Sequence, residues 1–183
     1  MKNHFRVIFV IALSLVLVLA LLSFHSTTIA QTETTPEENI ANVTNFYEEF
    51  SAGNVDVFLD LYADSVIRHT YGGLSGVVSA QELHQGFEML KRLIPDLSAE
   101  IHNIYASGDL VVAEVTWTGT HSARSFLDIP ATDRPFTVHT LNVRRFENGK
   151  VIEDWDVTDD LVFLQSIGYL PTLPQIIADG PVE

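Results

Sequence analysis

The segment NGKVIEDWDVTDD, residues 148–160, holds five acidic side chains within eight positions, together with one tryptophan and two valines. Successive side chains of an extended strand point to opposite faces. Asp154 and Asp156 are therefore expected on a solvated face. The residues expected on the opposite face are Val151, Glu153, Trp155 and Val157. Glu153 is thus the acid expected beside apolar groups.

A carboxylate in such surroundings could act as a general base. Desolvation beside Trp155 and Val157 would raise the pKa of Glu153 toward neutrality, which suits removal of a proton from the carbon next to a carbonyl group. His139 or His121 could donate a hydrogen bond to the enolate oxygen. A histidine on an apolar strand face is, however, more often a hydrogen-bonded core residue than a catalyst.

No metal or other cofactor is expected for this chemistry. The histidines His69, His121 and His139 lack a recognisable metal-ligand spacing. A proton transfer between side chains and a carbonyl compound needs neither a metal nor an electron carrier.

Helix signals dominate the first half of the chain. Thr35 is the expected N-cap of a helix that has Pro36 at its first position, continues to Phe50 and ends at Gly53, with Glu38 completing a capping box. The other helices are expected over residues 54–63, 79–94 and 159–168, and residues 169–183 are expected to form a proline-containing tail.

From residue 97 onward the hydrophobic period changes from about 3.6 to 2, which predicts strands. The expected strands are residues 97–106, 110–121, 136–146 and 150–157, joined in antiparallel hairpins by SGD and ENG turns. Helices followed by such strands predict an α+β domain with helices on one face of a curved sheet.

The strand faces expected to line the interior are mostly apolar, with few polar interruptions. This composition is typical of a small-molecule pocket. Besides the Glu153 face, the expected interior residues are Leu97, Ile101, Asn103 and Tyr105; Val111, Ala113, Val115, Trp117 and His121; and His139, Leu141 and Val143. For Trp117 and Trp155, ordinary core packing is an open alternative to ligand contact.

Four segments resemble a known family. In order, FYEEFSAGNVDVFLDLYADSVIRH, IPDLSAEIHNIYASGDLVVAEVTWTGTH, FLDIPATDRPF and RRFENGKVIEDWDVTDDLVFLQSIG are similar to the SnoaL-like polyketide cyclase, or ester cyclase, group of the nuclear-transport-factor-2-like superfamily. The resemblance implies an α+β fold in which a cone-shaped barrel of curved antiparallel sheet is covered by three to four helices. It also implies a homodimer and a cofactor-free cyclase.

The resemblance implies site residues by position. Glu153 and His139 take the places of an acid and a histidine that handle the proton in an aldol closure. His69 and His121 match histidines found in the wider group, and Asp133 replaces a glycine of the loop at the cavity mouth. The expected ligand contacts are Trp117, Trp155, Tyr105, Asn103 and Phe126.

Composition excludes some functions. The chain has no cysteine, so disulfides and thiolate chemistry are excluded. Only Lys2 and Arg6 of the ten basic residues, and none of the 24 acidic residues, precede Gln31, so the remaining chain has a net charge of −16 (8 minus 24). Such a charge argues against nucleic acid as a partner.

The first thirty residues have the three parts of a secretory signal peptide. A basic start is followed by an apolar run over residues 7–22 and by small residues ending at Ala30. Export to the periplasm or the extracellular space is expected, with no stable membrane contact after cleavage and one domain over residues 31–183. An uncut membrane anchor is the alternative, but sixteen apolar residues are short for a span of roughly 20.

Two classes of function stay open. The first is a cofactor-independent cyclase, isomerase or lyase that acts on an apolar carbonyl compound. The second is a secreted module that binds a small hydrophobic ligand without turnover.

The leader generates a testable prediction. Protein recovered from outside the cytoplasm should begin at Gln31, because the small residues before it suit a signal peptidase. Intact-mass measurement checks this, and a mass that retains residues 1–22 would contradict it.

Overall fold

The computed structural model describes residues 34–70, 75–123 and 128–179, and the expected signal peptide and Phe126 lie outside them. The described residues all belong to one unit, Thr32–Glu183. No helix among them is both long and apolar enough to span a membrane.

The described helices include those expected from the sequence and one more, α6, in the expected tail. They are α2 (Pro36–Ala52), α3 (Val57–Leu61), α4 (Ala80–Leu93), α5 (Asp160–Ser166) and α6 (Leu173–Asp179). Local chemistry fixes their starts. In α2 the Thr35 hydroxyl accepts from the Glu38 N–H at 3.2 Å while Glu38 accepts from the Thr35 N–H at 2.8 Å, and Ser79 and Glu82 repeat this capping box in α4.

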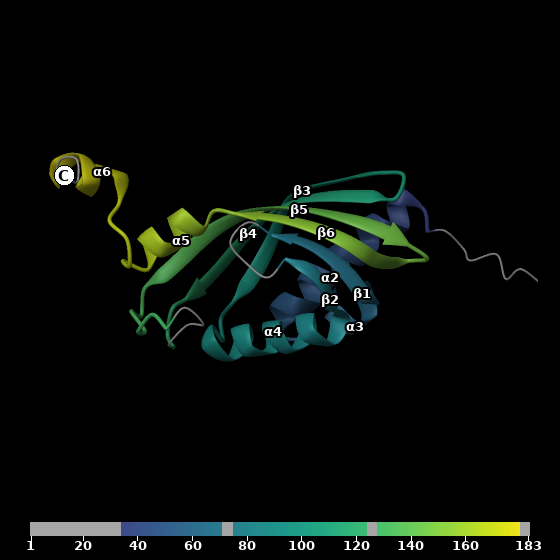
Figure 1. Cartoon of the computed structure of the whole chain (residues 1–183), viewed down its shortest axis with the longest axis horizontal. Coiled ribbons are helices and arrows are strands. Elements are labelled where there is room, and N and C mark those ends of the chain that lie inside the picture. The colour runs from purple at the N-terminus through teal and green to yellow at the C-terminus, as the bar shows by residue number, and fades with distance from the viewer. Residues whose placement is uncertain (1–33, 71–74, 124–127, 180–183) are drawn as a thin grey trace, which may run out of the picture. The chain divides into compact units, whose positions relative to one another are not determined.

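The strands form a six-stranded sheet in the order β2-β1-β6-β5-β4-β3. They are β1 (Tyr62–Thr70), β2 (Gly76–Ser79), β3 (Ser98–Ser107), β4 (Leu110–Thr120), β5 (Pro135–Glu147) and β6 (Lys150–Thr158). The expectation of a wholly antiparallel sheet is wrong, because β1, which the periodicity did not predict, pairs in parallel with β6. The curved α+β architecture is confirmed, with α2, α3 and α4 together on one side of the sheet (Figure 1).

An aromatic layer joins these helices to the sheet. Phe58 of α3 stacks on Phe87 of α4 with ring centroids 4.2 Å apart, and Phe50 of α2 meets Trp117 of β4 edge-on at 5.4 Å. We call the sheet face that this layer covers the inner face and the opposite one the outer face. Edge-to-face rings fill such a core while leaving polar edges free to bond.

Two bulges decide which side chains reach the inner face. In β3, Ile101 pairs with Val115 but Asn103 pairs with Glu114, so His102 is an extra residue. Asn103 and Tyr105 therefore lie on the outer face, and the prediction that they line the interior is wrong. A bulge of one residue turns every later side chain to the other face.

The second bulge is in β6. Val151 pairs with Phe146, whereas Glu153 pairs with Arg145, so β6 has one residue more than β5 at this point. Asp154 is consequently buried with Val151, and Glu153 lies on the other side. The predicted inward position of Glu153, Trp155 and Val157 is wrong for this reason.

In β5 the expected face is also inverted, although no bulge precedes it. The buried side chains alternate as Phe136, Val138, Thr140, Asn142, Arg144 and Phe146, while His139 and Leu141 are exposed. The criterion of apolarity fails here because the inner face of β5 carries the polar residues of a site. Of the strands predicted from residue 97 onward, β4 has the expected inner face throughout, with Val111, Ala113, Val115 and Trp117, and His121 is buried just after the strand ends.

Candidate functional site

Polar residues occupy three successive rows of the inner face where β5 and β6 pair. Arg144 lies opposite Asp154, Asn142 opposite Asp156, and Thr140 opposite Thr158. In the first row, β1 adds Arg68 on the other side of Asp154. Strand pairing thus brings two arginines and two aspartates together inside the core.

Two tyrosines accept hydrogen bonds from Arg144; Tyr47 connects the first row to the second, and Tyr62 connects Arg144 to Asp154 within the first row. Arg144 donates from Nη2 to the Tyr47 hydroxyl at 2.8 Å and from Nε to the Tyr62 hydroxyl at 3.1 Å. Tyr47 donates onward to Asn142 at 2.5 Å, and Tyr62 donates to Asp154 at 3.3 Å. The direction of each bond follows because a guanidinium can only donate.

Both branches end at Asp156. Asn142 donates from its amide nitrogen to Asp156 Oδ1, and Arg68 donates from Nη2 to Asp156 Oδ2. Arg68 Nε also lies 3.5 Å from Asp154 Oδ1, an ion pair that is long for a hydrogen bond. We call the closed circuit of these seven side chains the polar ring; its members are Tyr47, Tyr62, Arg68, Asn142, Arg144, Asp154 and Asp156.

The members of the polar ring differ in accessibility. Asn142, Arg144 and Asp154 are buried, whereas about 15% of the Asp156 side chain and 16% of the Arg68 side chain are exposed. Burial raises the pKa of Asp154 to about 6 against the opposing charge of Arg68, and burial also raises the pKa of Tyr47 and Tyr62. Asp156 is thus the more accessible of the two ring carboxylates, and it lies one row away from the residues that line the pocket.

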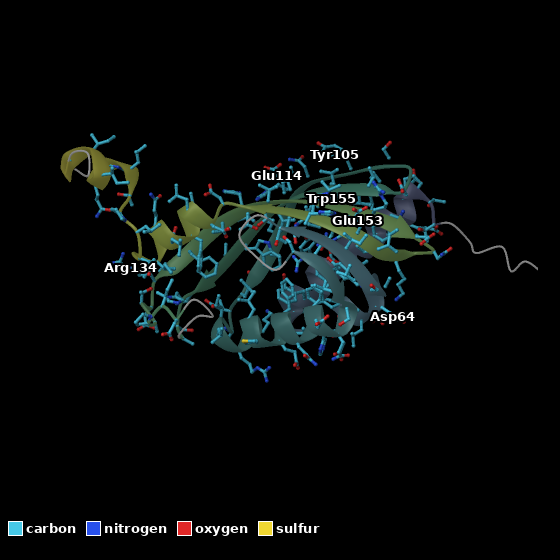
Figure 2. The ribbon with its side chains drawn as sticks, in the orientation of Figure 1. Asp64, Tyr105, Glu114, Arg134, Glu153 and Trp155 are labelled. Atoms are coloured by element: carbon cyan, nitrogen blue, oxygen red, sulfur yellow. The ribbon has the colours of Figure 1, made fainter. Side chains whose placement is uncertain are left out.

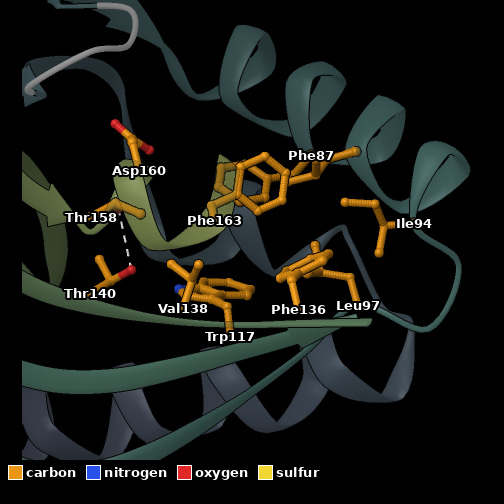
Figure 3. Close-up of a pocket in the computed structure, with 11 residues that line it drawn as sticks. Phe87, Ile94, Leu97, Trp117, Phe136, Val138, Thr140, Thr158, Asp160 and Phe163 are labelled. Carbon is orange, nitrogen blue, oxygen red and sulfur yellow. Dashed lines mark hydrogen bonds between the residues drawn. The ribbon is translucent and has the colours of Figure 1, made fainter. Parts of the chain in front are cut away.

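A pocket of about 230 Å³ begins at the third row (Figure 3). Its walls come from α4, the segment between α4 and β3, β4, β5, the end of β6 and α5, and they are largely apolar. The lining residues are Phe87, Leu90, Ile94, Leu97, Trp117, Phe136, Val138, Thr140, Thr158, Asp160 and Phe163. The polar ring therefore follows the pocket along the same two strands, one row beyond Thr140 and Thr158.

The residues predicted to be catalytic lie elsewhere. His69 Nε2 and Glu153 Oε1 do come together, 2.8 Å apart, and His69 stacks on Trp155. Glu153 and Trp155, however, lie on the outer face (Figure 2). His139 is exposed on the outer face and contacts the Thr116 hydroxyl at 3.0 Å. His121 is buried beyond β4, with Nδ1 3.1 Å from the Thr132 hydroxyl.

The predicted ligand contacts divide in the same way. Trp117 lines the pocket, whereas Asn103 lies on the outer face. Tyr105 and Trp155 also lie on the outer face (Figure 2). Among the residues that the structure describes, no three histidine or acidic side chains converge in a way that could hold a metal ion.

Sequence reasoning missed most of the polar ring. The sequence nevertheless contains two signals, one of a bulge in β3 and one of a polar face on β5. Ile101 and Ile104 are three positions apart, a spacing that places both on one strand face only if an extra residue intervenes. In β5, the polar residues Thr140, Asn142 and Arg144 alternate with the apolar residues Leu141 and Val143. The alternation shows that one face of β5 is polar, but it does not decide whether that face points to the interior or to solvent.

Residues 41–167 match the family model described as SnoaL-like polyketide cyclase. No curated protein has a sequence that matches the chain. Among solved structures, the chain is similar to IdmH, a proposed polyketide cyclase from Streptomyces antibioticus, with 26% identity and a TM-score of 0.63 over 71% of this chain and 98% of that one.

Two further structures support the fold. AclR, a proposed hydroxylase from Streptomyces galilaeus, is 23% identical with a TM-score of 0.69 over 81% of this chain and 96% of that one. A proposed SnoaL-like polyketide cyclase from Jannaschia sp. CCS1 is 22% identical with a TM-score of 0.65 over 76% of this chain and 99% of that one.

The buried Asp154 generates a prediction about stability. Its pKa of about 6 in the folded state is above the ordinary value near 4, so the folded protein binds this proton more tightly than the unfolded chain does. The resulting contribution to the free energy of unfolding is fully present below about pH 4 and is lost as pH rises through 6. Asp154→Asn has no carboxyl group to titrate. As pH rises from 5 to 8, the free energy of unfolding of the wild type should therefore fall by about 1 kcal/mol more than that of the variant, measured by urea denaturation.

Asp64→Asn is the matched control, because Asp64 is exposed on β1 (Figure 2). Its pH dependence should follow the wild type. An identical slope for all three proteins would contradict the burial effect at Asp154.

The family-model match over residues 41–167 and the similarity of the fold to the solved structure of a proposed polyketide cyclase point to the same family. The chain belongs to the SnoaL-like polyketide cyclase family, and it is a cavity protein of the cyclase or isomerase type with the fold of the nuclear-transport-factor-2-like superfamily.

Proposed function

We propose that this protein is a cofactor-independent enzyme in which Asp156 removes an α-proton from a small, largely apolar carbonyl compound, leading to cyclisation or isomerisation. The observation that carries the proposal is the position of Asp156. It is a partly accessible carboxylate with one fixed donor on each oxygen, one row from an apolar pocket. A general base needs such a fixed orientation and a path to the substrate.

The proposed step moves one proton and changes no oxidation state. The C–H bond breaks, its electron pair forms the enolate, and the proton goes to the free side of the Asp156 carboxylate. The enolate carbon then either attacks a second carbonyl in the same molecule or is protonated again at another carbon. Asp156 regains its ionised form when it returns the proton to the new alkoxide or carbon.

The ring residues hold Asp156 for this step. Asn142 is itself oriented, because its amide oxygen accepts from Tyr47 while its amide nitrogen donates to Asp156. Arg68 supplies a positive charge beside the carboxylate. Fixed neighbours of this kind keep a base within a few tenths of an ångström of its working position.

The pocket limits the size of the substrate. Its volume of about 230 Å³ is below the roughly 300–1,000 Å³ of sites for drug-sized ligands. We therefore infer a ligand of one or two fused rings or a short chain. AclR, a proposed hydroxylase with this fold, illustrates that the fold alone does not decide the reaction.

Asp156→Asn should abolish turnover without loss of binding. The amide keeps the shape but cannot take the proton, so exchange of the α-protons of a bound ketone with D2O should fall at least about 100-fold, measured by proton NMR. Glu153→Gln is the matched control, because Glu153 is an acidic residue of the same strand whose side chain lies on the outer face. It should keep nearly full exchange.

A reversed result, with Glu153→Gln inactive and Asp156→Asn active, would refute the assignment of the base to the polar ring. Ligand binding without any exchange by the wild-type protein would instead favour the secreted binding module.

We also propose that the outer face is the contact surface of a homodimer. An apolar row crosses it through paired positions Tyr105, Val112, Val143 and Trp155, and Leu141 pairs with Val157 beside this row. Tyr105, Leu141 and Val157 are 65%, 46% and 50% exposed. A contiguous apolar patch on a sheet typically marks an interface, and a second copy provides a matching one.

Leu141→Glu should convert the dimer to a monomer, because a twofold axis brings the two new charges close together. Light scattering after gel filtration measures the mass. Met89→Glu is the control, since Met89 is equally exposed on α4 but belongs to the other layer. A wild-type protein of monomer mass, or a Leu141→Glu variant of unchanged dimer mass, would contradict the proposal.

The leader peptide extends the proposal to location. We propose that the enzyme acts outside the cytoplasm, after cleavage near Ala30. Its net charge of −16 after cleavage (8 minus 24) would keep it away from anionic surfaces.

A further inference from the structure

The polar wall of the pocket is a pair of hydroxyl groups. Thr140 and Thr158 face each other across β5 and β6 with their Oγ1 atoms 3.3 Å apart (Figure 3). The two hydroxyls carry two protons, and their single mutual bond uses one. The other proton has no acceptor among the residues that the structure describes.

A second unpaired donor lines the same pocket. Trp117 precedes this row on the inner face, where it pairs with Val138. Its indole N–H can only donate, and it has no hydrogen-bond partner in the described part of the chain. An apolar ligand that covered both donors without an acceptor would leave them desolvated, at a cost of about 1–3 kcal/mol each.

The charge of the pocket limits the ligand further. The side chains lining it include Asp160 but no lysine or arginine. An anionic ligand would meet this carboxylate with no compensating cation, and a cationic ligand would leave the unpaired O–H and N–H without an acceptor. A neutral ligand with an acceptor oxygen gives the unpaired donors a possible partner and places no net charge beside Asp160.

The position of the threonine pair relative to the polar ring gives that oxygen a direction. Adjacent rows on one face are two residues apart, roughly 6–7 Å. A carbonyl oxygen at the threonine pair can therefore have its α-carbon directed to the Asn142–Asp156 row. We propose that Thr140 and Thr158 form the carbonyl-binding end of the pocket, donating a hydrogen bond to the oxygen of a neutral ketone; the direction of the α-carbon rests on the proposed function.

The test measures binding, so it does not depend on turnover. In a Trp155→Phe background, Trp117 is the only tryptophan and its fluorescence reports on the pocket. The probes are 2-decalone and its exocyclic methylene analogue, which replaces the carbonyl oxygen by CH2 at nearly constant shape.

The protein should bind 2-decalone more tightly than the methylene analogue. The double variant Thr140→Val/Thr158→Val, which removes both hydroxyl donors, should weaken 2-decalone binding about 2- to 10-fold, the range for one hydrogen bond, and leave binding of the analogue unchanged. Thr→Ser at either position should retain the preference. Thr118→Val is the matched control, because Thr118 makes a similar 3.0 Å hydroxyl contact with Ser98 on the exposed outer face.

The inference would be overturned if the protein with both threonines bound 2-decalone no more tightly than the methylene analogue, or if this preference survived substitution of both threonines by valine. It would also be overturned if the valine substitutions weakened binding of both probes equally, because the threonines would then only pack against the ligand. Asp156→Asn separates this inference from the proposed function. It should bind 2-decalone normally, and if it also kept full α-proton exchange, the base assignment would fail while the threonine pair could still hold the ketone.

Discussion

The interior of this protein must accommodate two guanidinium groups, and the polar ring is how it does so. A buried cation without a partner is very costly, and a buried ion pair is stable only when its remaining donors and acceptors are also satisfied. Arg144 is enclosed by the rings of Phe46 and Tyr47, with its carbon centre 5.1 and 5.0 Å from their centroids, and it donates to two phenol oxygens. The charge that balances it and Arg68 is supplied by Asp154 and Asp156.

This constraint connects the helices to the sheet. Tyr47 comes from α2 and Tyr62 from the junction of α3 and β1, so both helical elements must be in place before the ring can close. The ring of Phe46 packs edge-on against both tyrosines, with centroids 5.0 Å from Tyr47 and 6.2 Å from Tyr62. Removing one member would leave another buried polar group unpaired. Arg68 Nε, Arg144 Nη1 and Asp154 Oδ1 already have no hydrogen-bond partner in the described part of the chain.

The ring also explains why the sheet is irregular. Without the extra residue in β6, Glu153 and Trp155 would point inward and neither aspartate would reach the arginines. The bulge thus converts an acidic strand with an apparently apolar inner face into one that presents Asp154 and Asp156 to the core. The same device in β3 moves Asn103 and Tyr105 outward, where Tyr105 joins the apolar row of the outer face.

Local signals in the sequence predicted the helices well, because capping boxes at Thr35 and Ser79 and a regular apolar stripe are properties of adjacent residues. They also predicted the inner face of β4, whose alternation is unbroken. They failed for the site, because a period of two cannot show a one-residue bulge and because polar residues at an inner face resemble those at a solvated one. The parallel pairing of β1 with β6 joins segments more than eighty residues apart, which no local pattern records.

The most direct test of the central claim, that Asp156 is the group that meets the substrate, is a crystal structure of the Asp156→Asn variant with a bound ketone. We expect the carbonyl oxygen to lie at the Thr140–Thr158 pair and the α-carbon to lie about 3–3.5 Å from the side chain at position 156. A ketone bound on the outer face beside Glu153 and His69, or one in the pocket with its α-carbon turned away from position 156, would contradict it.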